Sequence, residues 1–389
     1  MEYVKIGNIA KSIVSGGTPK SIKAEYYNGN IPWLNTKEIN FNRIYSTEKC
    51  ITAEGLNNSS AKYIKENCVI IAMYGATAGR AAINKISLTT NQACCNIEVD
   101  SSKMDYNYVY YAIKNDYEHL SSLANGGAQQ NLNSLIIKDF EIPYVNLYIQ
   151  KKISKILTSI DKKIELNNEI NNNLYELAIK YLNEMQSNEE VTLSNFGKIQ
   201  GGYAFKSKDL LDAKTNNRII KIKNLRNEIS ADVINSQFVE NEVIDKLDNK
   251  FKIKKGNVAI AMTGAELGKT GFIYGFDDYY LNQRVGLVRG ITKEKELYLN
   301  ILLLSQEFQD LLNSKGYGSA QPNVSTADIE NITIQNIEDD DLIKFYEKVS
   351  PIYTKIILNC EENLNLEQLR DTLLPKLMNG EIDLDNIEI

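Results

Sequence analysis

The segment MYGATAGR at residues 73–80 returns as MTGAELGK at residues 262–269. Both copies keep the methionine, two glycines four residues apart and a basic residue at the end. Four more matches follow the same order along the chain: Gly16-Gly17 with Gly201-Gly202, Asn91-Gln92 with Asn282-Gln283, residues 127–131 (GAQQN) with 319–323 (SAQPN), and residues 166–169 (LNNE) with 358–361 (LNCE). The offsets run from 185 to 192, and five ordered matches indicate a duplicated unit of nearly half the chain.

Each copy has the same order of elements, with short β-like runs followed by a helical segment. Runs such as CVIIAM (68–73) and GNVAIAM (256–262) are apolar and bounded by Gly, Asn and Ser, which is typical of buried strands. In the helical segments the apolar residues recur at steps of three and four, as in paired helices. The residues expected at the helix pair and subunit interface are Ile153, Ile160, Ile164, Ile170, Leu174, Leu177, Ile352, Ile356, Leu366, Leu369 and Leu373.

We therefore predict an α+β fold with a pseudo-two-fold internal repeat: two similar mixed α/β domains joined by two long antiparallel coiled-coil helices. The expected bounds are a first domain at 1–147, a central helical region at 148–188, a second domain at 189–337 and a distal helical region at 338–389. Each helix could instead pack on its own domain, but equivalent stripes at equivalent places favour pairing. Pro351 predicts a break or kink, and Gly380 predicts a helix C-cap.

Composition excludes several classes of protein. The 389 residues are 43% hydrophobic and 24% charged, as in ordinary globular proteins, and no run of 18 apolar residues could span a membrane. Five cysteines without CxxC spacing fit a reducing cytosol, with neither a disulfide framework nor a zinc site, so we expect a cytoplasmic protein. A single histidine, His119, disfavours most metal sites and Ser-His or Cys-His catalysis.

The net charge of −6 argues at first against a nucleic-acid partner. Residues 1–146 carry +1 and residues 191–336 carry +2, whereas residues 337–389 hold 5 basic and 13 acidic side chains, net −8. The acidity therefore belongs to the C-terminal region. A near-neutral domain can still bind DNA through a local basic face, so the charge neither proves nor excludes DNA binding.

No catalytic or metal site is predicted. Gly264 to Thr270 resembles a phosphate-binding loop but has three residues between its glycines where that motif needs four. Cys94 and Cys95 with His119 have no counterpart in the second copy, and buried cysteines are usually small core residues. Acidic residues near Lys250 could suggest a metal nuclease, but such patterns arise by chance in a chain rich in Asp and Lys.

What remains is a set of side chains suited to phosphates and base edges, in loops that both copies share. The candidate DNA-binding residues are Thr18, Lys20, Ser21, Tyr27, Asn35, Lys37, Tyr74, Thr77, Arg80, Gln129, Gln130, Asn131, Tyr203, Lys206, Ser207, Lys221, Lys223, Asn224, Arg226, Thr263, Lys269, Arg284, Gln321 and Asn323. Each could equally belong to a solvated strand face, a helix cap or a closed turn. Trp33, the only tryptophan, is expected in the core.

Several of these motifs match a known family over the whole length. GGTP at 16–19 with IPW at 31–33, the turn at 75–80, QKKI at 150–153 leading to IDKKI at 160–164, and LRDTLLPKLMNGEI at 369–382 are the matching stretches. The chain thus resembles the specificity subunit of type I restriction-modification systems. The second copy departs at 201–205, where it reads GGYAF instead of GGTP, a difference expected where two domains read different half-sites.

The resemblance implies a non-catalytic subunit with no cofactor of its own that binds an asymmetric, bipartite double-stranded DNA sequence. Two target-recognition domains would each read one half-site, and the helix pair would set the unread spacer. The resemblance also implies two modification subunits, which carry S-adenosylmethionine for adenine-N6 methylation, and restriction subunits, which use ATP and magnesium. We expect the acidic C-terminal region to face protein. A helical scaffold that does not touch DNA, and a DNA-recognition region with its own nuclease activity, remain alternatives.

Overall fold

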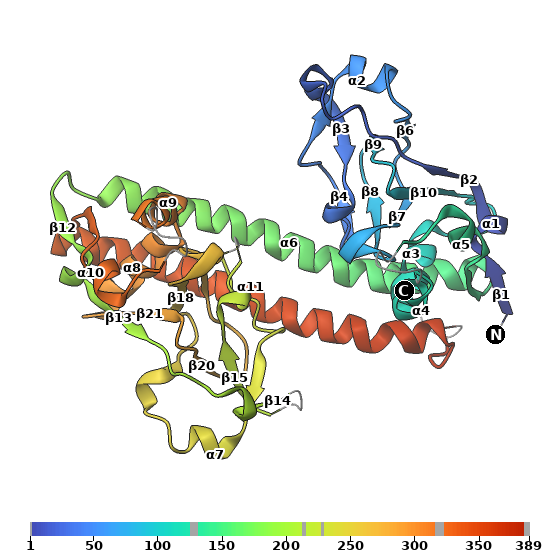
Figure 1. Ribbon diagram of the computed structural model, residues 1–389. Helices are drawn as coiled ribbons and strands as arrows, with labels where there is room; N and C mark the ends of the chain where they lie inside the picture. The colour runs from blue at the N-terminus through green and yellow to red at the C-terminus, as the bar shows by residue number, and fades with distance from the viewer. Residues whose placement is uncertain (1, 125–130, 212–214, 227–228, 316–322, 385–389) are drawn as a thin grey trace. The chain divides into compact units, whose positions relative to one another are not determined.

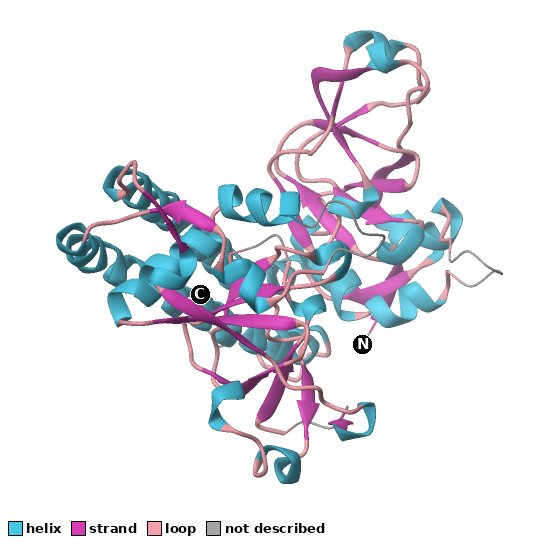
Figure 2. Cartoon of the chain, turned by 60° about the vertical axis from the view of Figure 1, so that its left-hand side comes forward, coloured by secondary structure: helices cyan, strands magenta, loops and turns pink. Residues whose placement is uncertain are grey.

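The computed structural model describes residues 2–124, 131–211, 215–226, 229–315 and 323–384 (Figure 1). The chain divides into two compact units: unit 1 is Met1–Lys162 with Glu367–Ile389, and unit 2 is Lys163–Leu366. Both combine short-stranded sheets with helices, which confirms the α+β prediction (Figure 2). In the described ranges no helix has the length and apolar composition that crossing a membrane requires.

Unit 1 contains a five-stranded sheet of order β2-β10-β7-β8-β4, a four-stranded sheet of order β5-β3-β9-β6 and the ribbon β1-β11. Its strands are β1 (Glu2–Lys5), β2 (Ala10–Ser15), β3 (Tyr27–Leu34), β4 (Asn42–Ile44), β5 (Cys50–Ile51), β6 (Tyr63–Ile64), β7 (Val69–Ala72), β8 (Ala81–Asn84), β9 (Leu88–Thr90), β10 (Cys94–Val99) and β11 (Glu141–Tyr144). Its shorter helices are α1 (Ile6–Ile9), α2 (Ala53–Asn57), α3 (Tyr106–Asn115), α4 (Tyr117–Ser122) and α5 (Ser134–Asp139). The tyrosine-rich helix α3 lies in the core, where Tyr108, Tyr110 and Tyr111 are fully buried.

Unit 2 contains a four-stranded sheet of order β13-β21-β18-β19, a five-stranded sheet of order β14-β16-β15-β20-β17 and the ribbon β12-β22. Its strands are β12 (Glu190–Thr192), β13 (Gly197–Gly201), β14 (Leu210–Leu211), β15 (Asn217–Ile220), β16 (Gln237–Val239), β17 (Lys252–Ile253), β18 (Val258–Ala261), β19 (Thr270–Phe272), β20 (Asp278–Leu281), β21 (Val285–Gly290) and β22 (Thr333–Gln335). Its shorter helices are α7 (Asn241–Ile244), α8 (Lys293–Leu304), α9 (Gln306–Lys315) and α10 (Thr326–Glu330).

The two units repeat one another in strand pairing. The antiparallel neighbours β2, β10 and β7 of unit 1 match β13, β21 and β18 of unit 2, and the parallel pair β3-β9 matches β15-β20. The duplication read from the sequence is thereby confirmed. One match shifts by a residue: Gly16 lies against Asn91 and Gly202 against Asn282, so Gly16 corresponds to Gly202. A Cβ at Gly202 would come within 2.1 Å of the Asn282 carbonyl oxygen, which explains the glycine.

Two long helices each contribute residues to both units. Helix α6 (Leu147–Met185) has 39 residues and α11 (Asp339–Met378) has 40, each about 60 Å long at ~1.5 Å per residue. Within unit 1, the Arg370 guanidinium on α11 donates to the Asp161 carboxylate on α6 at 3.1 Å, and the Lys152 ammonium donates to the Leu384 carbonyl at 2.7 Å. Because the partner number rises as the α6 number falls, the two helices are antiparallel, as predicted.

The buried seam between the helices differs in part from the predicted stripe. Ile153, Ile160, Ile164 and Ile356 are buried as expected. Leu174, Ile352, Leu366, Leu373 and Ile170 are only partly buried. Leu177 and Leu369 are 38% and 48% exposed, so neither is buried between the helices, and their place at a subunit interface stays a prediction.

Asparagines occupy positions of the helix seam that a search for apolar residues alone does not find. In unit 2 the seam continues from Ile164 through Asn167 (1% exposed) and Asn171 (3%), at alternating steps of three and four. Counting only apolar residues selected Ile170 instead, one helical position away from the seam.

The other two helix predictions have different outcomes. Helix α11 continues without interruption through Pro351, so the predicted break is absent, and the alternative of a kink stays a prediction. Its end is as expected: Gly380 has φ +71°, its amide donates to the Leu377 carbonyl (3.3 Å), and the Glu381 amide donates to the Lys376 carbonyl (2.9 Å). These are the two bonds of a Schellman cap, which confirms Gly380 as the helix terminator.

Candidate nucleic-acid interface

A tight glycine turn joins β7 to β8 in unit 1 and β18 to β19 in unit 2. Gly75 and Gly79 have φ +78° and +84°, and Gly264 and Gly268 have φ +79° and +82°, a region that favours glycine. The Gly79 amide donates to the Ala72 carbonyl at 2.8 Å, and the Gly268 amide donates to Ala261 at 3.0 Å. The repeated segment therefore encodes one backbone turn made twice.

A second turn follows the parallel strand β3 in unit 1 and β15 in unit 2. Both are 3-10 turns, Thr36–Glu38 and Ile222–Asn224. Each is closed by a side chain that caps the preceding amide: Glu38 accepts from the Asn35 amide and Asn224 from the Lys221 amide, both at 3.0 Å. Position 35 therefore corresponds to position 221.

A third segment lies beside these two turns in each unit. The Asn91 amide donates to the Leu34 carbonyl (3.0 Å), and the Asn282 amide donates to Ile220 (3.2 Å). The Met73 amide donates to Ala93 (2.8 Å) and the Met262 amide to Arg284 (3.1 Å). We call the assembled segments the turn clusters: residues 35–40, 74–80, 91–93 and Asn131 in unit 1, and residues 221–226, 263–269, 282–284 and Asn323 in unit 2.

In unit 1 the turn cluster presents amides, hydroxyls, the Arg80 guanidinium, and Lys37 and Glu38 of the 3-10 turn. The Thr77 hydroxyl donates to the Thr36 carbonyl at 3.0 Å, and Arg80 donates to the Asn40 side chain at 2.7 Å. The Asn91 amide group donates to the Asn35 side-chain oxygen at 3.3 Å. Tyr74 forms a β-bridge with Asn131, and its side chain is 40% exposed. Five predicted residues and three direct partners thus meet in this turn cluster.

In unit 2 the turn cluster is richer in charge. Lys221 donates to Gln237, and burial, then the neighbouring Lys223, lowers the pKa of Lys221. Lys269 forms an ion pair with Glu266 across the glycine turn. Thr263 forms a β-bridge with Asn323, the counterpart of the Tyr74 bridge. Lys223, Arg226 and Arg284 are exposed, and Arg226 is paired with Asp232.

The remaining candidates differ in their exposure and in their partners. Thr18, Lys20 and Ser21 are exposed, and the Tyr27 hydroxyl donates to the Pro19 carbonyl at 2.7 Å. Lys206 and Ser207 are exposed, whereas Lys37 is paired with Glu48. The Tyr203 amide donates to Leu281 at 2.8 Å, next to the third segment. Gln129, Gln130 and Gln321 lie outside the described residues.

Burial corrects the prediction for Asn224 and confirms the prediction for Trp33. Asn224 is 1% exposed, with its side-chain oxygen on the Lys221 amide and its nitrogen on the Asp232 carbonyl, so it holds the turn and does not face solvent. Trp33 is 5% exposed and donates from its ring nitrogen to the Gly17 carbonyl at 2.9 Å, which confirms it as core.

The predicted residues leave out several members of the turn clusters, among them Asn40, Gln92 and Gln283. Asn40, the partner of Arg80, had no signal because its approach depends on the fold. Gln92 and Gln283 are exposed at equivalent positions of the third segment. The repeated Asn-Gln pair marked these two glutamines, but the candidate set did not include them.

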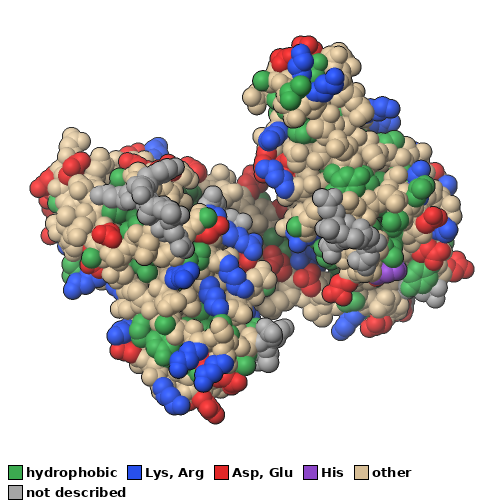
Figure 3. All heavy atoms as spheres, in the orientation of Figure 1, with side chains coloured by type: hydrophobic (Ala, Val, Ile, Leu, Met, Phe, Trp, Pro, Cys, Tyr) green, Lys and Arg blue, Asp and Glu red, His purple; other side chains and the backbone are tan. Residues whose placement is uncertain are grey.

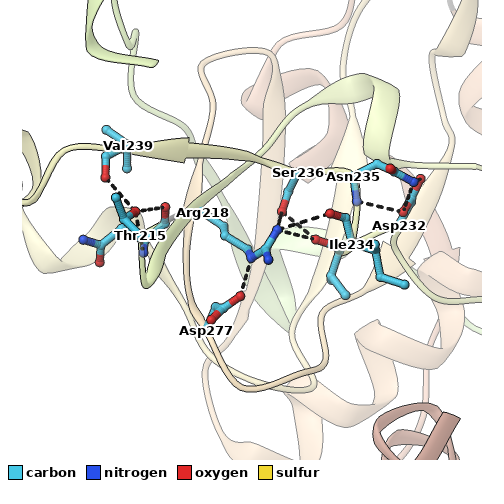
Figure 4. A network of polar contacts seen from close by, with 10 residues as sticks. Thr215, Arg218, Asp232, Ile234, Asn235, Ser236, Val239 and Asp277 are labelled. Atoms are coloured by element: carbon cyan, nitrogen blue, oxygen red, sulfur yellow. Dashed lines mark hydrogen bonds and ion pairs between the residues drawn. The ribbon is translucent and has the colours of Figure 1, made fainter. Parts of the chain in front are cut away.

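Arg218, another basic residue of unit 2, has a structural role. The Arg218 guanidinium pairs with Asp277 and donates to the Ile234 carbonyl at 3.2 Å and the Ser236 hydroxyl at 3.4 Å (Figure 4). Its carbon lies 4.2 Å from the centre of the Phe238 ring. Arg218 therefore fixes the segment that leads into β16. On the face in view, basic and acidic side chains are interspersed over both units (Figure 3).

The environments of Cys68, Cys94 and Cys95 do not suit thiol chemistry. Burial raises the pKa of Cys68 to about 11 and of Cys95 to about 12, and burial also places the pKa of Cys94 well above its usual value. Protonated thiols are poor nucleophiles at neutral pH. Among the described residues, no three or more His, Cys, Asp and Glu side chains are grouped so as to hold a metal ion.

Comparisons with known proteins agree on one family. The family model described as the type I restriction modification DNA specificity domain matches residues 1–176 and again 185–336. The chain is 26% identical over 412 residues to the type I restriction enzyme MjaIX specificity subunit of Methanocaldococcus jannaschii, covering 98% of this chain and 94% of that one. It is 29% identical over 167 residues to the EcoR124I/EcoR124II specificity subunit of Escherichia coli, covering 41% of each.

A solved structure supports the same fold. The type I restriction-modification system S subunit from M. genitalium superposes with a TM-score of 0.58 over 97% of this chain and 95% of that one, at 17% identity. The likeness at this identity concerns the fold alone. Since the family model covers both copies of the repeat, the chain belongs to the family of the type I restriction modification DNA specificity domain.

Proposed function

We propose that this chain is the DNA-reading subunit of a type I restriction-modification complex and recognises a bipartite, asymmetric duplex sequence. Each unit reads one half-site through its turn cluster. The observation that carries the proposal is that the two turn clusters share hydrogen-bonded backbone but differ in side chains. Asn35 corresponds to Lys221, and Thr77 to Glu266. The same scaffold with different donors and acceptors suits two different base sequences.

The proposal extends to the partners. Two modification subunits with S-adenosylmethionine dock on the helical regions and methylate adenine at N6, and restriction subunits with ATP and magnesium complete the nuclease. The helix pair sets the length of the unread spacer. The region 337–389, with a net charge of −8, faces protein because it would repel phosphate. The chain itself is non-catalytic in this proposal.

Exchange of residues 1–147 for the equivalent domain of a relative tests the proposal. A host that expresses the hybrid with the modification subunit is analysed by sequencing methylated adenines. We expect one half-site to change while the other half-site and the spacer stay the same. Change in both halves or in neither contradicts independent reading.

The chain without its modification subunit serves as the control in the same experiment and should transfer no methyl group from labelled S-adenosylmethionine. A gel shift of the assembled complex on its methylated motif separates the proposal from a scaffold that does not contact DNA. A scaffold would give the same mobility with and without the motif.

A further inference from the structure

The two turn clusters differ in charge at the third residue of the glycine turn. This residue is Thr77 in unit 1 and Glu266 in unit 2. The backbone correspondence is set by matching bonds: the Arg80 amide donates to Thr77 at 2.9 Å, and the Lys269 amide donates to Glu266 at 3.1 Å. Position 77 therefore carries a neutral hydroxyl where position 266 carries a carboxylate.

Glu266 lies in a basic neighbourhood. The Lys269 ammonium is paired with the Glu266 carboxylate, and the two side chains are 30% and 42% exposed. Arg284, on the adjoining segment, is exposed and occupies the position of Ala93 in unit 1. The turn cluster of unit 2 thus combines one carboxylate with cations on a surface open to solvent.

A carboxylate on a DNA-binding surface is unfavourable unless it has a donor to meet. Phosphates repel it, and so do the O6 and N7 acceptors of guanine and the O4 acceptor of thymine. The exocyclic amino group of cytosine is a donor in the major groove that a carboxylate accepts from. The lysine beside it can donate to O6 or N7 of the paired guanine. Adenine also presents a donor, its N6 amino group, but the N7 acceptor beside that group repels a carboxylate, so this acceptor and donor side by side fit a C·G pair better than an A·T pair.

We propose that Glu266, held by Lys269, discriminates a C·G base pair in the half-site read by unit 2. This inference rests on the proposed function of the chain. Much of the discrimination comes from repulsion of the wrong bases, because a fixed carboxylate penalises every acceptor placed opposite it. Loss of the charge then relaxes one base position while general DNA affinity is kept.

The equivalent position in unit 1 cannot impose this requirement. Thr77 has no charge, and its hydroxyl donates to the Thr36 carbonyl. Arg80 corresponds to Lys269 but donates to the amide of Asn40 and not to an acid. The two half-sites should therefore differ at the base pair that faces this turn.

The test uses the full chain assembled with its modification subunits. The purified complex methylates a duplex library in which each position of the motif is varied, and the wild type is compared with Glu266→Gln. We expect the wild type to prefer C·G at one position of the unit 2 half-site, and Glu266→Gln to lower that preference by about tenfold or more. The other half-site and the spacer should be unchanged.

Two further variants give independent readings. Glu242→Gln on α7 removes the same charge from an exposed position beyond the opposite end of the β15-β20 pair and should leave every preference unchanged. Thr77→Glu places the carboxylate in the turn of unit 1 and should create a new preference for C·G in the other half-site. If Glu266→Gln folds poorly, as judged by its melting temperature, the Thr77→Glu result decides.

The outcomes separate the inference from the function on which it rests. A wild-type complex that methylates no bipartite motif would contradict the proposed function itself. A bipartite motif whose preferences are the same in Glu266→Gln and in wild type would overturn only the role of Glu266. Relaxation at an A·T pair, or a uniform loss over all sequences, would also overturn it, since either would mean that Glu266 does not read C·G.

Discussion

Four buried asparagines in unit 2 pair the long helices with each other. Asn167 donates to the Asn363 side chain, Asn363 to Asn168, and Asn359 to Asn171, each at 2.8 Å. Asn167, Asn171, Asn359 and Asn363 are between 1% and 8% exposed. An amide in a helix seam is satisfied in one register only, so this asparagine belt should fix the register of α6 against α11 at some cost in stability.

Substitution of one partner should be costly, and substitution of both should not. Asn359→Leu leaves the Asn171 side-chain oxygen buried without its donor, which costs about 1–3 kcal/mol. Asn171→Leu removes the acceptor and costs a similar amount. The double variant replaces both amides by apolar groups, so its loss should be smaller than the sum by about 1 kcal/mol or more.

Urea unfolding followed by far-ultraviolet circular dichroism measures this coupling through the helices. Trp33, the single tryptophan, lies in unit 1 and provides a separate fluorescence reporter that these variants should not move. Asn172→Leu, at an exposed position of α6, is the matched control and should change stability by less than about 0.5 kcal/mol. Strictly additive losses, or single losses no larger than that of Asn172→Leu, would refute the role of the belt.

Two further predictions concern unit 1 and the long helices. Burial alone would raise the pKa of Asp161, but the Tyr111 hydroxyl and the charges of Lys114, Arg370 and Arg43 outweigh it and keep the pKa below its usual value. Asp161→Asn should therefore destabilise unit 1 by about 3–5 kcal/mol at pH 7. A carboxyl group with a depressed pKa stabilises the fold fully only above its unfolded pKa, so the difference from wild type should shrink as the pH falls below about 4. Trp33 fluorescence during urea unfolding measures this difference, and a difference that does not change with pH would contradict the ion-pair explanation. Four helix-forming residues inserted after both Lys162 and Leu366 add ~6 Å to each helix and should lengthen the preferred spacer by about one or two base pairs. Insertion in α6 alone should disrupt either the Asp161 contacts or the asparagine belt. Sequencing of methylated sites measures the spacer, and an active double insertion with the original spacer would refute the proposal that the helix pair sets the spacer length.

Much of the fold could be predicted because the sequence contains two copies of the same unit. The glycine turn has the same positive φ angles in both copies, so its glycines had to recur. The long helices followed from steps of three and four, and Gly380 marked the last helix end. These features are local: each depends on residues within one turn or one helix.

The parts that sequence reasoning missed depend on contacts between distant residues. Asn167 and Asn363 are 196 positions apart, and only the antiparallel register shows that their amides meet. An apolar count passes over such a pair, because a buried amide resembles a solvated one until its partner is known. The Arg80 contact with Asn40 has the same character, since it joins the glycine turn to a residue outside any repeated motif.

The duplication also explains why the candidate site could be located more easily than it could be interpreted. Backbone bonds such as Met73 to Ala93 and Met262 to Arg284 are the same in both units, so comparing the copies separates what builds the turn cluster from what varies on it. The glycines recur because the backbone requires them. Asn35 with Lys221, and Thr77 with Glu266, differ although the backbone around them is the same. The fold does not require these differences, so a preference for one base sequence over another can reside in them. They change what the surface binds without changing how the unit folds.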